Sequence, residues 1–301
     1  MTPTARIEIH SFETVTLTDK QFLMGRKDGT AARIGAELRL PGGAAKLSAV
    51  ALVHGSDGVG ANVDRWAQEL NGIGVAAFLM DSFTGRGITE TVTNQSQLGH
   101  LAMIFDVYRA LDLLSQHERI DRSRIAVLGF SKGGFVALYA SLKRFQRVYG
   151  TMGLEFAAYL PFYAPCNTVY REDEQVSDRP IRMFHGAADD YVSVLPCRKY
   201  VERLRQAGKD VQLTEYSGAG HAFDNPAYTP ALYRPDALTT ARCLREERTG
   251  GEIVNLETGQ PFRWSDACVK RGATLAYDPV ATSEAIRVVK AFLTATFKLS
   301  T

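Results

Sequence analysis

A serine placed between two glycines, directly after a short apolar run, is the feature that most constrains how this chain can fold. Residues 125–129 form the apolar run, Ser131 follows it, and a segment that can form a helix continues to about Arg147. This order predicts a strand, a sharp turn and a helix, with the serine hydroxyl at the apex of the turn. Glycine is needed on both sides because a Cβ atom there would collide with the returning backbone. We predict that Ser131 is a nucleophile, although the pattern also suits a plain turn in which serine caps a helix.

Strand and helix patterns alternate along nearly the whole chain. Two alternating stretches, residues 6–10 and 36–40, indicate antiparallel strands at a sheet edge. Apolar runs typical of buried strands lie at residues 47–53, 75–80, 125–129, 156–162, 181–184 and 211–216. Helical patterns lie at about residues 63–72, 95–117, 196–206 and 281–297. The fold class predicted is α/β, a mostly parallel, doubly wound sheet with helices on both faces and functional loops at the carboxyl ends of the strands.

One stretch of about sixty residues, 222–280, does not fit the alternation. It contains turn signals, Cys243, Cys268 and Trp264, and a structureless loop of this length would be uncommon. We expect an insertion that lies near the active site; the alternative is a surface insertion unrelated to substrate. The length of 301 residues and the 45% hydrophobic content suit one domain over 1–301, with edge strands at 5–40.

Charge and cysteine content limit the partners and leave the compartment open. Lys and Arg total 35 against 33 Asp and Glu, which argues against a nucleic-acid partner, and no apolar run is long enough to span a membrane. The four cysteines are either buried thiols or two disulfides, Cys166–Cys197 and Cys243–Cys268. The N-terminus is not a signal peptide as written. We expect a cytoplasmic protein if the sequence is complete, and a periplasmic or secreted one if a signal was removed; the oligomeric state stays open.

A nucleophilic serine needs a base and an orienting carboxylate, and both have candidates on strand-end loops. His221 follows the strand at 211–216 among small residues, and either Asp189 or Asp190 suits the carboxylate on spacing alone. The order serine, aspartate, histidine is that of α/β-hydrolases. The oxyanion needs two backbone N–H groups, for which we predict Lys132 and either Ser56 or Asp57, in the loop after residues 47–53.

From about Ser48 to Phe297 the chain resembles the dienelactone hydrolase family of α/β-hydrolases. The resemblance is carried by VHGSDG (53–58), GFSKGG (129–134), FYAPC (162–166), HGAADDYV (185–192) and YSGAGHAF (216–223). It implies hydrolysis of an ester or lactone, and its G-x-x-D-x-x-V pattern selects Asp189 over Asp190. The chain departs from the founding members, which use cysteine as nucleophile, lack the 222–280 insertion and place an arginine one position away from Arg86.

The sequence thus predicts a serine hydrolase that cleaves a carboxylic ester or lactone through an acyl-enzyme, with no cofactor and no metal. Its partner is expected to be a small-molecule ester or lactone. The alternatives are a peptidase or acyltransferase of the same fold, and a binding protein that has kept the fold without the chemistry. The candidates for lining the substrate pocket are Phe83, Arg86, Tyr163, Phe223 and Trp264.

Overall fold

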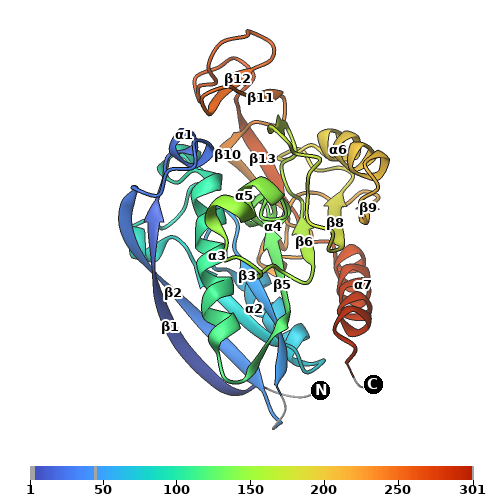
Figure 1. Ribbon diagram of the computed structural model, residues 1–301. Helices are drawn as coiled ribbons and strands as arrows, with labels where there is room; N and C mark the ends of the chain where they lie inside the picture. Colours follow the sequence, from blue (N-terminus) through green and yellow to red (C-terminus); the bar gives the residue numbers. More distant parts are fainter. Residues whose placement is uncertain (1–3, 44–45, 300–301) are drawn as a thin grey trace.

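An eight-stranded sheet forms the centre of the computed structural model, which describes residues 4–43 and 46–299 (Figure 1). Its strands, in the order in which they lie side by side, are β1 (Thr4–Thr16), β2 (Thr30–Pro41), β4 (Ala76–Asp81), β3 (Leu47–Val53), β5 (Ile120–Phe130), β6 (Tyr159–Phe162), β8 (Ile181–Gly186) and β9 (Val211–Tyr216). β1 pairs with β2 and β2 with β4 in antiparallel fashion, and every other pair of neighbours is parallel. The predicted fold class and the antiparallel edge are confirmed.

Helices cover both faces of this sheet. The α-helices of the described residues are α1 (Asp19–Leu23), α2 (Ala61–Asn71), α3 (His100–Gln116), α4 (Lys132–Tyr139), α5 (Lys143–Tyr149), α6 (Leu195–Gln206) and α7 (Pro279–Phe297). Side chains alternate along β3, so that Ala51 packs in the core beneath α3 and α4, while Leu52 packs in the core beneath α2 and α7. A strand buried on both faces must be apolar throughout, which explains the continuous run at 47–53. No helix of the described residues is both long and apolar enough to span a bilayer.

Two predicted helices differ from those in the structure. The helix expected at 95–117 begins only at His100, because the preceding residues form a short 3₁₀ turn, η2 (Gln95–Gln97), and Leu98 is extended. The helix expected to continue from the serine turn to Arg147 is split into α4 and α5. The Ser141 hydroxyl donates to Leu138 O at 2.5 Å, and residues 141–143 pair with the backbone of residues 175–177, which removes them from the helix.

The insertion at 222–280 contains short strands, so the prediction that residues 211–216 form the last strand is wrong. Strands β10 (Leu232–Thr239) and β13 (Lys270–Leu275) form one antiparallel pair. Strands β11 (Arg245–Arg248) and β12 (Glu252–Asn255) form a hairpin that extends the short β7 (Thr168–Val169). In Figure 1 this hairpin lies beside α1, at the end of the molecule opposite the N- and C-termini.

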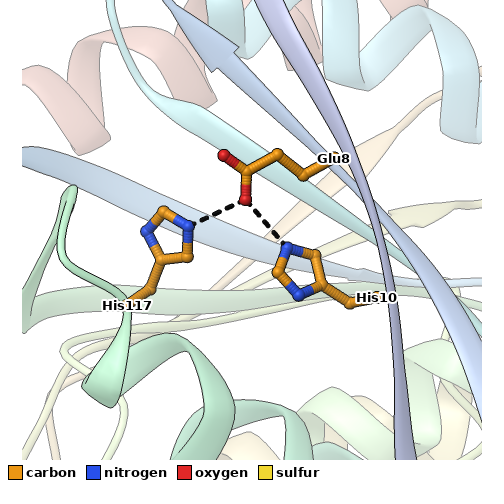
Figure 2. A group of neighbouring side chains, drawn as sticks. All are labelled: Glu8, His10 and His117. Carbon is orange, nitrogen blue, oxygen red and sulfur yellow. Dashed lines mark hydrogen bonds and ion pairs between the residues drawn. The ribbon is translucent and has the colours of Figure 1, made fainter.

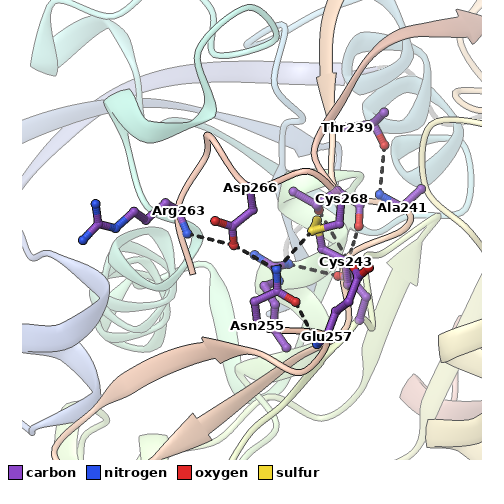
Figure 3. Close-up of a disulfide and its surroundings, with 11 residues drawn as sticks. Thr239, Ala241, Cys243, Asn255, Glu257, Arg263, Asp266 and Cys268 are labelled. Carbon is purple, nitrogen blue, oxygen red and sulfur yellow. Dashed lines mark hydrogen bonds between the residues drawn. A yellow bond between two sulfur atoms is a disulfide. The ribbon is translucent and has the colours of Figure 1, made fainter. Parts of the chain in front are cut away.

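Both expected cysteine pairs are joined, Cys166 to Cys197 and Cys243 to Cys268. Figure 3 shows how the second disulfide is embedded in the insertion. Asn255 of β12 donates to Asp266 Oδ2 at 2.9 Å and contacts Cys268 Sγ at 3.7 Å, and its own side-chain oxygen accepts from Glu257 N at 3.0 Å. The disulfide and this network therefore hold the two ends of the β11–β12 hairpin together.

Candidate active site

The turn at Ser131 is built by extremely close approach of backbone segments. Ser131 has φ of 53° and ψ of −112°, a conformation that side-chain-bearing residues rarely adopt. A Cβ atom at Gly129 would lie 2.0 Å from Gly133 O, and one at Gly133 would lie 2.1 Å from Val53 O. Both positions therefore require glycine, as predicted, and the turn presses the start of α4 against the carboxyl end of β3.

Ser131, His221 and Asp189 lie in one hydrogen-bonded line. His221 Nε2 is 3.0 Å from Ser131 Oγ, and His221 Nδ1 is 2.7 Å from Asp189 Oδ2. Because a carboxylate only accepts, Nδ1 carries the proton, which leaves Nε2 free to accept from the serine hydroxyl. The rings of Tyr163 and Tyr191 contact the imidazole edge to face, with centroids at 4.7 and 4.8 Å. The imidazole is thus fixed in both tautomer and orientation.

The two neighbouring aspartates have different surroundings. Asp189 is buried and also accepts from the backbone N–H groups of Tyr191 and Val192 at 2.9 and 2.7 Å. Burial alone would raise its pKa, but the charge of His221 and the hydrogen bonds of His185 and His221 hold the pKa of Asp189 well below its usual value. Asp190 instead accepts from the N–H and hydroxyl of Thr274, both at 2.9 Å, and so fastens β13 to this loop.

Two of the residues predicted to supply an oxyanion N–H, Ser56 and Asp57, line the same cavity as Ser131, and the third, Lys132, follows Ser131 in the chain. Lys132 begins α4, so its N–H has no acceptor within the helix. Ser56 and Asp57 line the cavity from the loop after β3, and their N–H groups make no hydrogen bond within residues 4–43 and 46–299. These N–H groups are therefore available as donors, as stabilisation of an oxyanion would require.

Of the five predicted pocket residues, only Tyr163 lines the small cavity at Ser131, which has a volume of about 50 Å³. Arg86 forms a buried, bidentate ion pair with Asp106, at 2.8 Å for both hydrogen bonds, so its guanidinium is already neutralised. Phe83 packs edge to face on His54, and Phe223 is wholly buried in the core. Trp264 lines a different cavity. The expectations for these four residues at the Ser131 cavity are therefore corrected.

The cavity is lined instead by residues that the sequence analysis did not select. They come from helices, loops and a strand that are far apart in the sequence, and include Asn62, Val92, Tyr191, Asn225, Tyr228 and Leu275. Tyr191 follows Asp189 by two residues, a proximity that could have indicated it. The others reach the cavity through contacts between distant segments, such as the hydrogen bond from Tyr228 OH to Asp57 Oδ2 at 2.6 Å. No local pattern marks such residues.

Part of the chain is similar in sequence to known proteins. A family model described as phospholipase/carboxylesterase matches residues 87–229. Over 140 residues the chain is 29% identical to a Bradyrhizobium protein named "Probable 2-oxo-3-(5-oxofuran-2-ylidene)propanoate lactonase", covering 45% of this chain and 54% of that protein. Over 102 residues it is 30% identical to acyl-protein thioesterase 1 of Gibberella zeae, covering 33% of this chain and 41% of that protein. The chain thus spans about half the length of the curated relatives it matches.

The likeness in structure extends over nearly the whole chain. A dienelactone hydrolase-like promiscuous phosphotriesterase from metagenomic libraries superposes with a TM-score of 0.61 at 17% identity, covering 96% of this chain and 98% of that one. The chain has the α/β-hydrolase fold. The resemblance to dienelactone hydrolases is thereby confirmed at the level of the fold.

A cluster of Glu8, His10 and His117 is the one group in the described part of the chain whose donor atoms lie close enough together for a metal ion (Figure 2). Glu8 Oε2 lies 3.1 Å from His10 Nε2 and 3.0 Å from His117 Nε2. However, His117 Nδ1 accepts from the N–H of Arg119 at 3.1 Å, so Nε2 carries the proton and donates to Glu8. A metal would need that nitrogen unprotonated. The cluster instead ties β1 to the end of α3.

Lys132, the residue that follows the proposed nucleophile, has a buried amine. Its side chain is 1% exposed, and Nζ donates to Leu98 O at 2.7 Å. No carboxylate of the described residues lies within 4 Å of it. Burial lowers the pKa of Lys132 to about 7. The residue that supplies a predicted oxyanion donor through its backbone therefore carries a side chain that titrates near neutral pH.

Replacing this side chain is expected to change how stability depends on pH. Between about pH 7 and pH 10.5 the unfolded chain binds the Lys132 proton and the folded chain does not, so the free energy of unfolding rises with pH. The linkage relation limits the slope of this contribution to about 1.4 kcal/mol per pH unit. Lys132→Met removes this contribution, and urea unfolding of both proteins between about pH 7 and 9 measures it.

Lys199→Met is the matched control, because Lys199 is exposed on α6. It should keep the slope of the unaltered protein. Equal slopes for Lys132→Met and the unaltered protein would contradict the inference that the amine is neutral in the folded state above pH 7.

Proposed function

We propose that this α/β-hydrolase is a serine esterase that cleaves a carboxylic ester or lactone through an acyl-enzyme intermediate. The observation that carries the proposal is the position of His221, within hydrogen-bond distance of both Ser131 Oγ and Asp189 Oδ2. The names of its relatives, which include a lactonase and a thioesterase, agree with acyl transfer as the reaction class. We also propose that residues 1–301 act as one domain, since the insertion and the edge strands both pack against the central fold.

The first half of the reaction transfers the acyl group to the enzyme. Ser131 Oγ attacks the carbonyl carbon while its proton passes to His221 Nε2. The buried carboxylate of Asp189 stabilises the imidazolium that forms. The N–H of Lys132 and that of Ser56 or Asp57 donate to the developing oxyanion. Collapse of the tetrahedral intermediate breaks the ester bond, and His221 returns its proton to the leaving alkoxide.

The second half releases the acid. Water takes the place of the alcohol, His221 Nε2 removes its proton, and the hydroxide attacks the acyl carbon. The same N–H groups stabilise the second oxyanion, and His221 protonates Ser131 Oγ as the acyl–oxygen bond breaks. A binding protein without chemistry would have no need for the strained Ser131 backbone, which favours the enzyme over that alternative.

Loss of the nucleophile should abolish most of the activity. Ser131→Ala is expected to lower kcat for p-nitrophenyl acetate by roughly 10³-fold or more while leaving thermal unfolding unchanged. A fluorophosphonate probe should label the unaltered protein at Ser131 and fail to label the variant, as followed by mass spectrometry of the intact protein. Near-normal ester hydrolysis by the variant would contradict the proposed mechanism.

The neighbouring aspartates provide an internally controlled pair. Asp189→Asn should lower kcat by roughly 10³-fold or more, because an amide at this position no longer favours the required tautomer of His221. Asp190→Asn makes the same chemical change one residue away, where the carboxylate only contacts Thr274, and kcat should stay within a few-fold. Steady-state kinetics of both variants tests the assignment, and a larger loss in Asp190→Asn would reverse it.

The small cavity at Ser131 predicts a preference for short acyl groups. Its volume of about 50 Å³ holds a few water-sized groups, and Tyr163, Tyr191 and Leu275 close it. We expect kcat/KM for p-nitrophenyl acetate to exceed that for the octanoate ester by roughly tenfold or more, since a long chain would have to displace these side chains. A series of p-nitrophenyl esters of increasing length measures this, and p-nitroanilide analogues test the peptidase alternative. A preference for octanoate would contradict the expected acyl site.

A further inference from the structure

A second cavity, much larger than the one at Ser131, lies between the insertion and the loop before α3. Its volume is about 370 Å³, against about 50 Å³ at Ser131. The residues of this second cavity that bear on its chemistry are Asp19, Gln95, His100, Phe135, Arg245 and Trp264. A cavity of this size can hold a small organic molecule or a large part of one.

The second cavity adjoins the active site through two residues. Phe135 lines it from α4, one helical turn after the nucleophile, and its N–H donates to Ser131 O at 2.9 Å. The amide of Gln95 stands between the two cavities. It donates to Ser56 Oγ at 3.0 Å and to Tyr191 OH at 3.4 Å, and both of these residues line the cavity at Ser131. Gln95 therefore lines the second cavity and is hydrogen-bonded to two residues that line the cavity at Ser131.

Arg245 brings to the second cavity a positive charge that no ion pair neutralises. Within the residues that the structure describes, the only hydrogen-bond acceptor for its guanidinium is Asn167 Oδ1, at 3.0 Å, and no carboxylate lies within 4 Å. Its Nε is buried and has no partner in that part of the chain. Burial lowers the pKa of Arg245, as expected for a charge that the surroundings stabilise poorly. Arginine nevertheless stays protonated, so the charge persists.

Aromatic side chains line the second cavity together with Arg245. The guanidinium carbon lies 4.8 Å from the ring centroid of Phe262, whose ring meets that of Trp264 edge to face at 5.5 Å. On the opposite wall His100 and Phe135 are in contact, with centroids at 5.0 Å. Burial lowers the pKa of His100 well below its usual value, so its ring is neutral and adds no second cation.

A carboxylate on the wall limits how much negative charge a ligand can carry. Asp19 lines the second cavity at the N-terminus of α3, where a Cβ atom on Gly99 would lie only 2.4 Å from its Oδ1. It is too far from Arg245 for an ion pair, and burial raises its pKa. The lining carries two cations, Lys20 and Arg245, and two carboxylates, Asp19 and Glu252, so it has no excess of positive charge. A monoanion on Arg245 therefore meets less repulsion than a dianion such as phosphate.

We propose that the second cavity binds a monocarboxylate attached to a flat aromatic group, with the carboxylate on Arg245 and the ring among Phe135, Phe262 and Trp264. The ligand has two sources, an aromatic acid group of the ester substrate that extends past Gln95, or a separate small aromatic acid. The first source rests on the proposed esterase function, and the second does not.

Direct binding tests the site without any turnover. Isothermal titration calorimetry of the full chain with benzoate should show binding, and benzamide, which has the same shape without the charge, should bind tenfold or more weaker. Inorganic phosphate should also bind tenfold or more weaker than benzoate. Arg245→Gln should weaken benzoate binding about tenfold or more and leave benzamide unchanged, with Arg245→Lys between the two. Arg242→Gln, three residues away and outside the cavity, is the matched control and should bind benzoate normally.

Tryptophan fluorescence locates the bound ring. The chain has two tryptophans, and Trp66 is wholly buried in the core. Benzoate should therefore change the emission of the unaltered protein and have no such effect on Trp264→Phe. Absence of benzoate binding, equal affinity in Arg245→Gln, or phosphate binding as tight as benzoate would each overturn the proposal.

Inhibition kinetics then separates the two sources. Benzoate that competes with p-nitrophenyl acetate, with a competition constant raised in Arg245→Gln, indicates a group of the substrate. Benzoate that binds through Arg245 without competing indicates a separate small acid. Because affinity is measured without hydrolysis, an absence of esterase activity would contradict the proposed function while leaving the binding result intact.

Discussion

The close backbone contact at the Ser131 turn is the constraint on which the rest of the site depends. With no side chain at Gly129 or Gly133, the start of α4 packs directly on the end of β3, since a Cβ at Gly133 would lie 2.1 Å from Val53 O. This contact brings the Lys132 N–H to the loop that contains Ser56 and forces Ser131 into positive φ. A strained backbone of this kind persists only where its surroundings fix it, here β3, β5 and β6 of the central sheet.

Residues whose position follows from local pattern could be predicted from the sequence, and residues placed by distant contacts could not. The buried strands are marked by continuous apolar runs, and the Ser131 turn is marked by its two glycines. The residues that line the pocket share no comparable sequence pattern. Arg86 would suit a substrate carboxylate by its position in the chain, yet Asp106 of α3 neutralises it through a contact that the sequence does not reveal. Leu275 enters the cavity only because β13 lies beside His221.

The insertion was predictable from the sequence only in part. Its place near the active site was predictable from its location directly after His221, and β13 does border the histidine, with Ala276 N donating to His221 O at 3.1 Å. Its strands were not predictable, because four to eight polar residues carry little periodicity. The two adjacent aspartates have different roles. Asp189 contacts His221, whereas Asp190 binds Thr274 and so attaches the insertion to this loop.

The buried cations of the molecule fall into two kinds, and the difference bears on the second cavity. Arg86 and Arg144 each face a buried carboxylate in bidentate geometry, so their charges need nothing further. Lys132 and Arg245 have no carboxylate within 4 Å in the described chain. Lysine can lose its proton when burial makes the charge costly, and the pKa of Lys132 is lowered to about 7. Arginine cannot, so Arg245, which is partly buried and lines the second cavity, is the cation that an anion from outside the chain would stabilise.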